Sequence, residues 1–161
     1  MFALAHPAEG ENRTDRERDG IAGPVQTIRH ETVRDFTVAQ VLQFTRRVPL
    51  RTVTYDARGN KAKVVIYDPA SPRNKQTEDY KYDDSGRKIE WSLRQGSRKM
   101  TTIYRYDPQL HKIEALERVV VSGKQSITRR YISVFDSGGR QTEASYSENS
   151  GSEIKAFYSY E

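Results

Sequence analysis

The sequence has no cysteine and no long hydrophobic run. The absence of cysteine excludes disulfide bonds, thiolate metal sites and cysteine nucleophiles, and it leaves the redox compartment open. No apolar run reaches the roughly 18–20 residues that a membrane-spanning helix needs, so we expect no membrane span. Histidine is also scarce: His6 lies outside the expected fold, His30 and His111 are far apart in the sequence, and His111 occupies a turn position. A histidine-based metal site is therefore not expected.

Sequence motifs for catalysis are missing as well. There is no His-x-x-x-His pair, no phosphate-binding glycine loop and no nucleophile elbow. Glu90, Glu114 and Glu143 occupy equivalent positions of a repeat, and two facing carboxylates can hydrolyse a glycosidic bond. The same pattern is typical of a charged strip on a solvated face, paired with Lys81, Arg105 and similar residues. We adopt the second interpretation and predict no catalytic residue, no metal site and no cofactor.

The composition is polar, yet it contains many aromatic residues. The 161 residues are enough for one domain with a core of its own. Hydrophobic residues make up only 35% of the chain and charged residues 30%, which is compatible with a sheet that faces water on one side. Ten tyrosines, all between Tyr55 and Tyr160, argue against disorder in that region.

Charge is unevenly distributed along the chain. The net charge is +5, but residues 1–19 hold three arginines against five acids, so they carry −2 and the remainder carries +7. A basic body can attract nucleic acid, an anionic polysaccharide or a membrane surface. Because positive and negative residues alternate rather than forming a block, we favour a solvated outer face.

The first 19 residues differ from the rest of the chain. They are largely polar, and Ala3-Leu4-Ala5 matches the A-x-A pattern of an export-signal cleavage site. We therefore expect residues 1–19 to be a disordered tail or the remnant of an export signal, and residues 20–161 to form the folded domain. The pattern favours a periplasmic or secreted protein, with a cytoplasmic location as the alternative.

An aromatic residue followed by aspartate recurs at Tyr55, Tyr82, Tyr106 and Phe135, at spacings of 27, 24 and 29 residues. In three copies a glycine stands three positions after the aspartate, which is the preferred pattern of a type I turn. The carboxylate accepts a hydrogen bond from a backbone N–H, and glycine adopts the left-handed conformation without steric cost. The other copy has Leu110 in place of glycine, at a cost of about 1–2 kcal/mol if Leu110 must be left-handed. The predicted turn residues are Asp56, Gly59, Asp83, Gly86, Asp107, Asp136 and Gly139.

Between these turns, apolar and polar residues alternate with the period of two that is typical of β-strands. Residues 23–33 indicate a further strand, and residues 37–45 fit either a strand or one or two helical turns. The sequence thus predicts an all-β fold: an antiparallel meander of roughly eight to ten strands, built from repeated β-hairpins. Second turns are predicted at 94–97, 121–124 and 149–152, with a longer loop at 68–79 in the first unit.

The hairpin register depends on whether each loop has three or four residues. A three-residue loop pairs Tyr82 with Lys88, whereas a four-residue loop pairs Tyr82 with Ile89 and Tyr80 with Trp91. Since a matched apolar pair contributes roughly 0.2–1 kcal/mol, we favour the four-residue loop. The same choice gives two further pairs, Tyr106 with Ile113 and Phe135 with Thr142.

The turns resemble those of the YD-repeat (RHS-repeat) family, whose unit is close to Y-D-x-x-G-[RN]. The match covers roughly residues 50–161: "YDARGN" and "YDDSGR" match fully, "FDSGGR" replaces Tyr by Phe, and "YDPQLH" lacks the glycine. Residues 19–32 are similar to the opening of small exported bacterial YD-repeat proteins. The resemblance implies an all-β meander at the cell surface or in the envelope. Carbohydrate binding is a general suggestion for the family, and no binding residue carries over.

Aromatic residues at alternate strand positions are predicted to share one sheet face. Such rings either form the core, buried by sheet curvature or by the N-terminal segment, or form a partly exposed platform. A platform suits a protein or a sugar and, with interleaved arginine and lysine, single-stranded nucleic acid. The candidate binding face consists of Tyr80, Tyr82, Trp91, Tyr104, Tyr106 and Tyr131.

We expect a non-catalytic binding module of the envelope or of the secreted fraction, for a polysaccharide or a surface protein. A basic protein that binds single-stranded nucleic acid is one alternative, and a structural scaffold without a soluble ligand is another. In the scaffold case, residues 153–161 would form an exposed edge strand for self-association.

Overall fold

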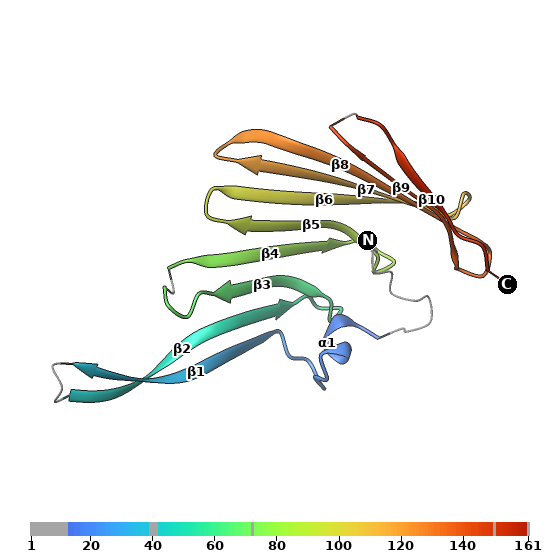
Figure 1. Cartoon of the computed structure of the whole chain (residues 1–161). Helices are drawn as coiled ribbons and strands as arrows, with labels where there is room; N and C mark the ends of the chain where they lie inside the picture. Colours follow the sequence, from blue (N-terminus) through green and yellow to red (C-terminus); the bar gives the residue numbers. More distant parts are fainter. Residues whose placement is uncertain (1–12, 39–41, 72, 150, 161) are drawn as a thin grey trace.

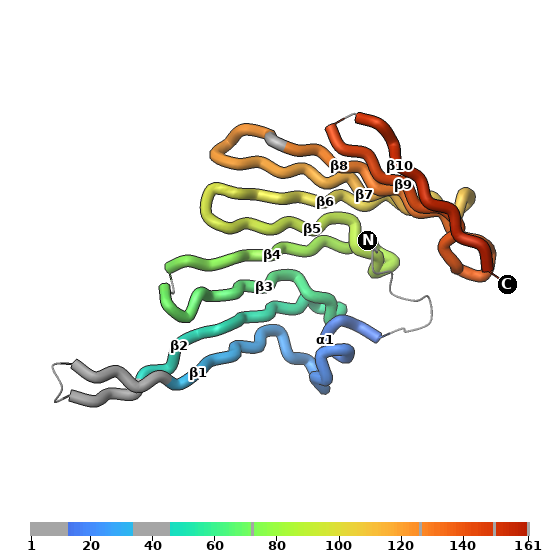
Figure 2. Tube along the Cα trace, in the orientation of Figure 1, coloured from blue at the N-terminus to red at the C-terminus, as the bar shows by residue number. Residues whose placement is uncertain are grey.

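The computed structural model describes residues 13–38, 42–71, 73–149 and 151–160, and this part of the chain folds as one antiparallel sheet (Figure 1). Ten strands lie side by side in chain order, so neighbours in the sheet are also neighbours in the sequence (Figure 2). The predicted all-β meander is confirmed. The strands are β1 (Thr27–Val38), β2 (Leu42–Tyr55), β3 (Lys61–Tyr67), β4 (Lys75–Tyr82), β5 (Lys88–Gln95), β6 (Arg98–Asp107), β7 (Lys112–Val121), β8 (Lys124–Phe135), β9 (Gln141–Glu148) and β10 (Ile154–Phe157).

The second turns are short and lie close to the predicted positions. Ser122 and Gly123 connect β7 to β8 with φ angles of 50° and 78°, the pair of positive angles that suits a two-residue hairpin. The loop predicted at 68–79 is too long, because β4 begins at Lys75 and pairs with β3. In the undecided segment 37–45, the described residues belong to β1 and β2, and residues 39–41 lie outside the described part.

The Asp-x-x-Gly turns have the predicted hydrogen bonds. Gly86 donates its N–H to the carbonyl of Asp83 over 3.0 Å, and Gly86 is left-handed with φ 80°. The Asp83 carboxylate accepts from the backbone N–H groups of Ser85 and Arg87 at 3.0 and 2.9 Å. In the turns that begin at Asp56 and Asp136, the carboxylate likewise accepts from the backbone N–H four residues on, at 2.9 Å, and Gly59 and Gly139 are left-handed with φ 86° and 78°.

A β-bulge beside the turn reconciles the two candidate registers. Tyr82 pairs with Lys88, as a three-residue loop requires, so the predicted pairing of Tyr82 with Ile89 is wrong. Farther from the turn, Tyr80 pairs with Trp91, as the four-residue loop predicts. Ile89 is therefore the extra residue of a bulge, and each register is found on one side of it.

The other two predicted pairs have opposite outcomes. Phe135 pairs with Gln141 rather than Thr142, because the same bulge follows the turn at Asp136. Tyr106 pairs with Ile113 as predicted.

In the turn without glycine, His111 is the left-handed residue. It has φ 45°, while Asp107 pairs with Lys112, so the loop is one residue longer than the Gly-containing turns. The Asp107 carboxylate still accepts from the N–H groups of Gln109 and Leu110, each at 3.1 Å. The strain expected at Leu110 therefore falls on His111.

Packing is tightest where N-terminal residues cover the beginning of the sheet. Val53, Tyr55 and Val64 form a buried core cluster, and Ile21 packs against it. Residues 13–21, which we call the N-terminal strap, include the one-turn helix α1 (Asp15–Arg18). Thr14 and Glu17 form a capping box at its start. The prediction that all of 1–19 is a tail is corrected for residues 13–19, which belong to the fold; residues 1–12 lie outside the described part.

Candidate binding face

The predicted candidate residues come together on one face of the sheet. Cross-strand partners share a face, and alternate residues along a strand return to it. Tyr80 pairs with Trp91, and Trp91 pairs with Thr102, two residues before Tyr104. We call this side the aromatic face, because it carries Tyr80, Tyr82, Trp91, Tyr104, Tyr106, Tyr131 and Tyr146, all half-buried.

The N-terminal strap closes the part of the aromatic face that lies over β2 to β4. The Asp15 carboxylate accepts from the Tyr82 hydroxyl at 2.8 Å and from the Lys61 backbone N–H at 2.9 Å. The Asp19 carboxylate accepts from the Tyr55 hydroxyl at 2.5 Å, and Tyr55 is only 4% exposed. In this part the rings belong to the core, as one of the two sequence interpretations anticipates.

Farther along the sheet, β6 to β9 carry a row of aromatic side chains. Tyr104 pairs with Ala115, Ala115 with Tyr131, and Tyr131 with Tyr146. The centroids of the last two rings lie 5.2 Å apart with the rings tilted by 41°. Ala115, which is fully buried, forms a small-residue floor between the first ring and the second. We call these four residues the aromatic row.

A row of polar side chains runs beside the aromatic row on the same face. Its members are cross-strand partners in turn, and we call them the polar row: Thr102, Glu117, Arg129 and Glu148. The Arg129 guanidinium donates to Glu117 at 2.9 Å and to Glu148 at 3.0 Å. The Tyr146 hydroxyl also donates to Glu148, at 2.6 Å, and so links the two rows.

Hydrogen bonds fix the charges of the polar row. The bond from Tyr146, followed by the bond from Arg129, lowers the pKa of Glu148 below its ordinary value. Hydrogen bonds to Glu148 and Glu117 raise the pKa of Arg129. With its two carboxylates and one guanidinium, the polar row has a formal charge of −1.

A second carboxylate lies among rings on β4 and β5. Glu78 accepts from the Tyr80 hydroxyl at 2.5 Å and from the Trp91 indole N–H at 3.3 Å. Burial, followed by the bond to Glu78, raises the pKa of Tyr80. The polar tips of Tyr80, Tyr82, Trp91, Tyr106 and Tyr146 thus have hydrogen-bond partners, while the rings of the aromatic face are only half-buried.

The opposite face carries most of the basic side chains, and we call it the basic face. Among the strand residues from β3 to β10, only Tyr67 and Phe157 place a ring there. The basic residues are Lys63, Lys75, Lys81, Arg94, Lys99, Arg105, Lys112, Arg118, Arg130 and Lys155, and the acidic ones are Asp79, Glu90, Asp107, Glu114 and Glu143. Alternation along the strands therefore places most of the strand cations on this face. Two cations lie with the rings instead: Arg87 over Tyr106 at 4.9 Å and Lys88 over Tyr80 at 5.3 Å from the ring centroids.

The three glutamates at the repeat position lie on the basic face, each with a basic partner. Glu90 pairs at 2.8 Å with Lys81, one of the basic residues expected to partner this strip. Glu114 pairs with Arg130 at 2.8 Å, and Arg105, which the sequence also suggests as a partner of this strip, lies opposite Glu114 in the register. The third ion pair, between Glu143 and Lys155, measures 3.3 Å.

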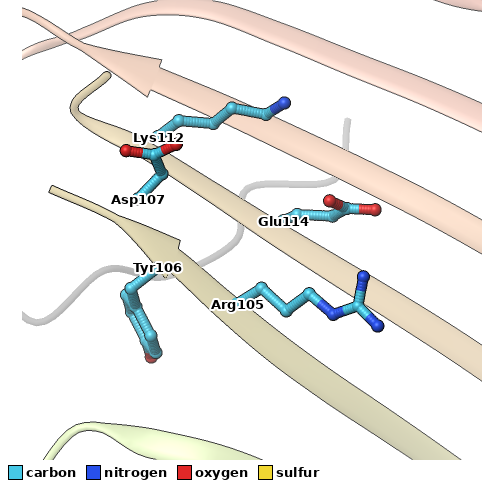
Figure 3. Close-up of a pocket in the computed structure, with 5 residues that line it drawn as sticks. All are labelled: Arg105, Tyr106, Asp107, Lys112 and Glu114. Carbon is cyan, nitrogen blue, oxygen red and sulfur yellow. The ribbon is translucent and has the colours of Figure 1, made fainter. Parts of the chain in front are cut away.

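An open hollow of about 250 Å³ lies at the hairpin between β6 and β7. Figure 3 shows its lining residues, Arg105, Tyr106, Asp107, Lys112 and Glu114. Tyr106 points away from the four charged side chains, because it lies on the aromatic face. The hollow is therefore a charged depression of the basic face rather than part of the two rows.

Two kinds of site are absent from the residues that the structure describes. These residues include no cluster of three or more histidine, aspartate or glutamate side chains with the geometry to hold a metal ion. Within the same residues, no helix has the length and apolarity to cross a membrane.

Sequence reasoning identified the rings of this face but missed its charged members. Glu117, Arg129 and Glu148 stand at alternate positions shared with apolar or aromatic residues, such as Ala115 and Tyr131. Charged residues at inward-facing positions are the signal that could have revealed them. Their mutual contacts depend on the pairing of β7, β8 and β9, which the sequence alone did not fix.

No protein-family model matches the chain, and no curated protein sequence matches it. The resemblance to YD-repeat proteins therefore stays an expectation that depends on the turn motif.

Proposed function

We propose that the protein is a non-catalytic binding module whose aromatic face holds a polysaccharide chain. The observation that carries the proposal is the aromatic row lying directly beside the polar row on β6 to β9. A sugar ring is amphipathic: its C–H groups pack against aromatic rings, and its hydroxyl groups hydrogen-bond with carboxylates and guanidinium groups. Adjacent aromatic and polar rows offer both kinds of contact to one extended chain.

The charge of this face favours a neutral or an amino-sugar polysaccharide. The polar row contributes −1 through Glu117, Arg129 and Glu148, whereas the positive charge gathers on the basic face. A polyanion on the aromatic row would meet two fixed carboxylates, and like charges in close contact oppose binding. Anionic polysaccharide and nucleic acid are therefore poorer ligands for these rows.

The separation of the aromatic row from most of the basic strand residues also argues against the nucleic-acid alternative. Proteins that bind single strands combine a positively charged groove for the backbone with aromatic side chains for the bases. Here the rings of the aromatic row and basic residues such as Lys99 and Arg118 lie on opposite faces of one sheet. One strand of nucleic acid cannot use both at once.

We place this activity outside the cytoplasm, in the periplasm or the secreted fraction. The A-x-A pattern at Ala3-Leu4-Ala5 and the resemblance to exported YD-repeat proteins support this location. Mass spectrometry of the native protein tests it. Processing after Ala5, which would leave His6 first, supports export, and a retained Met1 contradicts it.

Trp91 provides the test of the ligand class. It is the single tryptophan, it is half-buried on the aromatic face, and it pairs with Thr102 of the polar row. Cello-, chito- and xylo-oligosaccharides, alginate and single-stranded DNA are titrated while Trp91 fluorescence and binding heat are recorded, at low and at raised salt. We expect saturable, salt-tolerant binding of a neutral or amino-sugar chain. Binding of DNA alone that is lost with salt, or no binding of any glycan, would overturn the proposal.

A further inference from the structure

The last strand leaves an exposed edge with several apolar side chains. In the described part of the chain β10 lies at the end of the sheet, next to β9 only (Figure 2). Ile154 and Phe157 are 66% and 75% exposed, and Tyr158 and Tyr160 are 45% and 49% exposed. A free edge with large apolar side chains is a template for pairing with another strand.

The backbone groups that point outward from this edge can be identified. Tyr158 donates its N–H to the Thr142 carbonyl of β9 at 3.0 Å. Backbone groups of alternate residues point to the same side of a strand, so Ile154 and Ala156 also face β9. Lys155 and Phe157 therefore direct their N–H and C=O groups away from the sheet.

We propose that β10 pairs antiparallel with β10 of a second copy of this chain, about a two-fold axis normal to the sheet at Ala156. This arrangement is an isologous contact, in which the same strand serves on both sides. Lys155 then lies opposite Phe157 of the second copy, and each pair exchanges two backbone hydrogen bonds through the outward groups. Four bonds form within the two strands. This inference does not depend on the proposed ligand.

Charge and strand overlap select this register over its neighbours. With the axis at Lys155, the two Lys155 side chains would lie directly opposite each other, and like charges in that position destabilise a pair. With the axis at Phe157, only one hydrogen-bonded residue pair would remain within Ile154–Phe157. Centring on Ala156 avoids the repulsion and retains both pairs.

The proposed axis also continues the aromatic face into the second copy. Ile154 is the β10 partner of Tyr146 and so extends the aromatic row by one strand. In the proposed register Ile154 lies opposite Tyr158 of the second copy, on the same face. Both aromatic faces then look to the same side of one extended sheet, because the axis is normal to the sheet.

Disulfide cross-linking of single cysteine variants tests this register directly, because the chain has no cysteine of its own. Ala156 would form a non-hydrogen-bonded pair with its counterpart, at a Cα separation of about 4.5 Å, which a disulfide accepts. The variants are A156C, K155C and F157C, and all three parent residues are exposed. Each variant is oxidised mildly at a concentration where the wild type self-associates, and the amount of covalent dimer is measured on non-reducing gels. A156C is expected to cross-link at least about tenfold faster than the other two variants.

Other results would contradict either the register or the edge pairing. Faster cross-linking of K155C or F157C would place the axis at that residue and overturn the register. A wild type that remains monomeric in sedimentation equilibrium, or that forms open polymers through β1 while A156C stays reduced, would overturn the edge pairing itself.

A charge test needs no cross-linking. In the proposed register a residue at 157 faces Lys155 of the second copy, so F157E should dimerise at least about threefold more tightly than F157K. Both variants lose the same phenyl ring, which makes each the control for the other. Equal dimer dissociation constants for the two variants would contradict the register.

Discussion

At the scale of single residues, two glycines with the same backbone conformation have different surroundings. Gly59 and Gly86 stand at equivalent turn positions with φ 86° and 80°. A Cβ at Gly86 would meet nothing within 4 Å, whereas a Cβ at Gly59 would lie 3.0 Å from the Thr14 hydroxyl oxygen. Gly59 therefore serves both the turn and the seating of the N-terminal strap.

Alanine substitutions separate these two roles. We expect G86A to cost about 1–2 kcal/mol of unfolding free energy, because alanine is strained in the left-handed region. G59A should cost at least about 1 kcal/mol more, since Thr14 must move and its capping box is disturbed. Urea denaturation gives both values. The Arg16 amide donates to the Gly59 carbonyl at 2.9 Å, so its hydrogen exchange should accelerate only in G59A. Equal losses of unfolding free energy and equal exchange rates in the two variants would disprove the strap contact.

Arg129 and Arg130 are adjacent in β8 but lie on opposite faces. Arg129 holds Glu117, whose side chain is 13% exposed, whereas Arg130 is 50% exposed and pairs with Glu114. R129A should cost about 1–3 kcal/mol, because it leaves a largely buried carboxylate without its cation. R130A should cost less than about 1 kcal/mol, as exposed ion pairs do. Chemical denaturation of the two variants checks the order, and a larger loss in R130A would show that the assignment of faces is wrong.

At the scale of elements, the contact between the N-terminal strap and Tyr55 makes the free energy of unfolding decrease at alkaline pH. Burial, followed by the bond to Asp19, raises the pKa of Tyr55 to about 12, against about 10 in an unfolded chain. A raised pKa means that the folded chain holds the proton more tightly. The stabilisation is therefore complete below pH 10 and is lost as the pH rises from 10 towards 12, by about 1.4 kcal/mol per unit.

The Y55F variant tests this dependence. It removes the titrating hydroxyl, so its unfolding free energy should fall less steeply between pH 10 and 12 than that of the wild type. Denaturation series at fixed pH values measure both slopes. Parallel slopes would mean that Tyr55 ionises as freely in the folded chain as in the unfolded one.

The same elements show how far the sequence predicts the fold. The turns at Asp56, Asp83 and Asp136 follow from local chemistry, since the aspartate, the glycine and their hydrogen bonds all lie within five residues. The meander follows from turns of that length. The bulge at Ile89 could not be predicted, because it satisfies the turn register and the pairing of Tyr80 with Trp91 at the same time.

Long-range contacts were beyond prediction for a related reason. The strap makes its bonds to residues 36 to 67 positions away, through Asp19 to Tyr55 and Asp15 to Tyr82. Its acidic residues look like a solvated tail when only neighbours in sequence are considered. Only the folded sheet brings the hydroxyl groups of Tyr55 in β2 and Tyr82 in β4 within hydrogen-bonding distance of the strap.

At the scale of the whole molecule, one sheet presents two surfaces of different chemistry. Aromatic rings and a hydrogen-bonded polar row occupy one face, and most basic residues occupy the other. The proposed β10 contact would double the aromatic face without turning it over. A polysaccharide long enough to reach both copies would then bind more tightly than a short one, by the effective concentration of the second site.

Two adjacent residues of β8 test whether the ligand binds to the aromatic face. Tyr131 belongs to the aromatic row, and Ile132 lies on the basic face; both are half-buried. Binding of the glycan that gives the strongest Trp91 response is measured by titration calorimetry for Y131A and I132A, each shown to be folded by circular dichroism. If the ligand lies on the aromatic face, Y131A should bind it at least about tenfold more weakly, and I132A should differ from the wild type by no more than about twofold. Equal losses in both variants, or a larger loss in I132A, would contradict binding at this face.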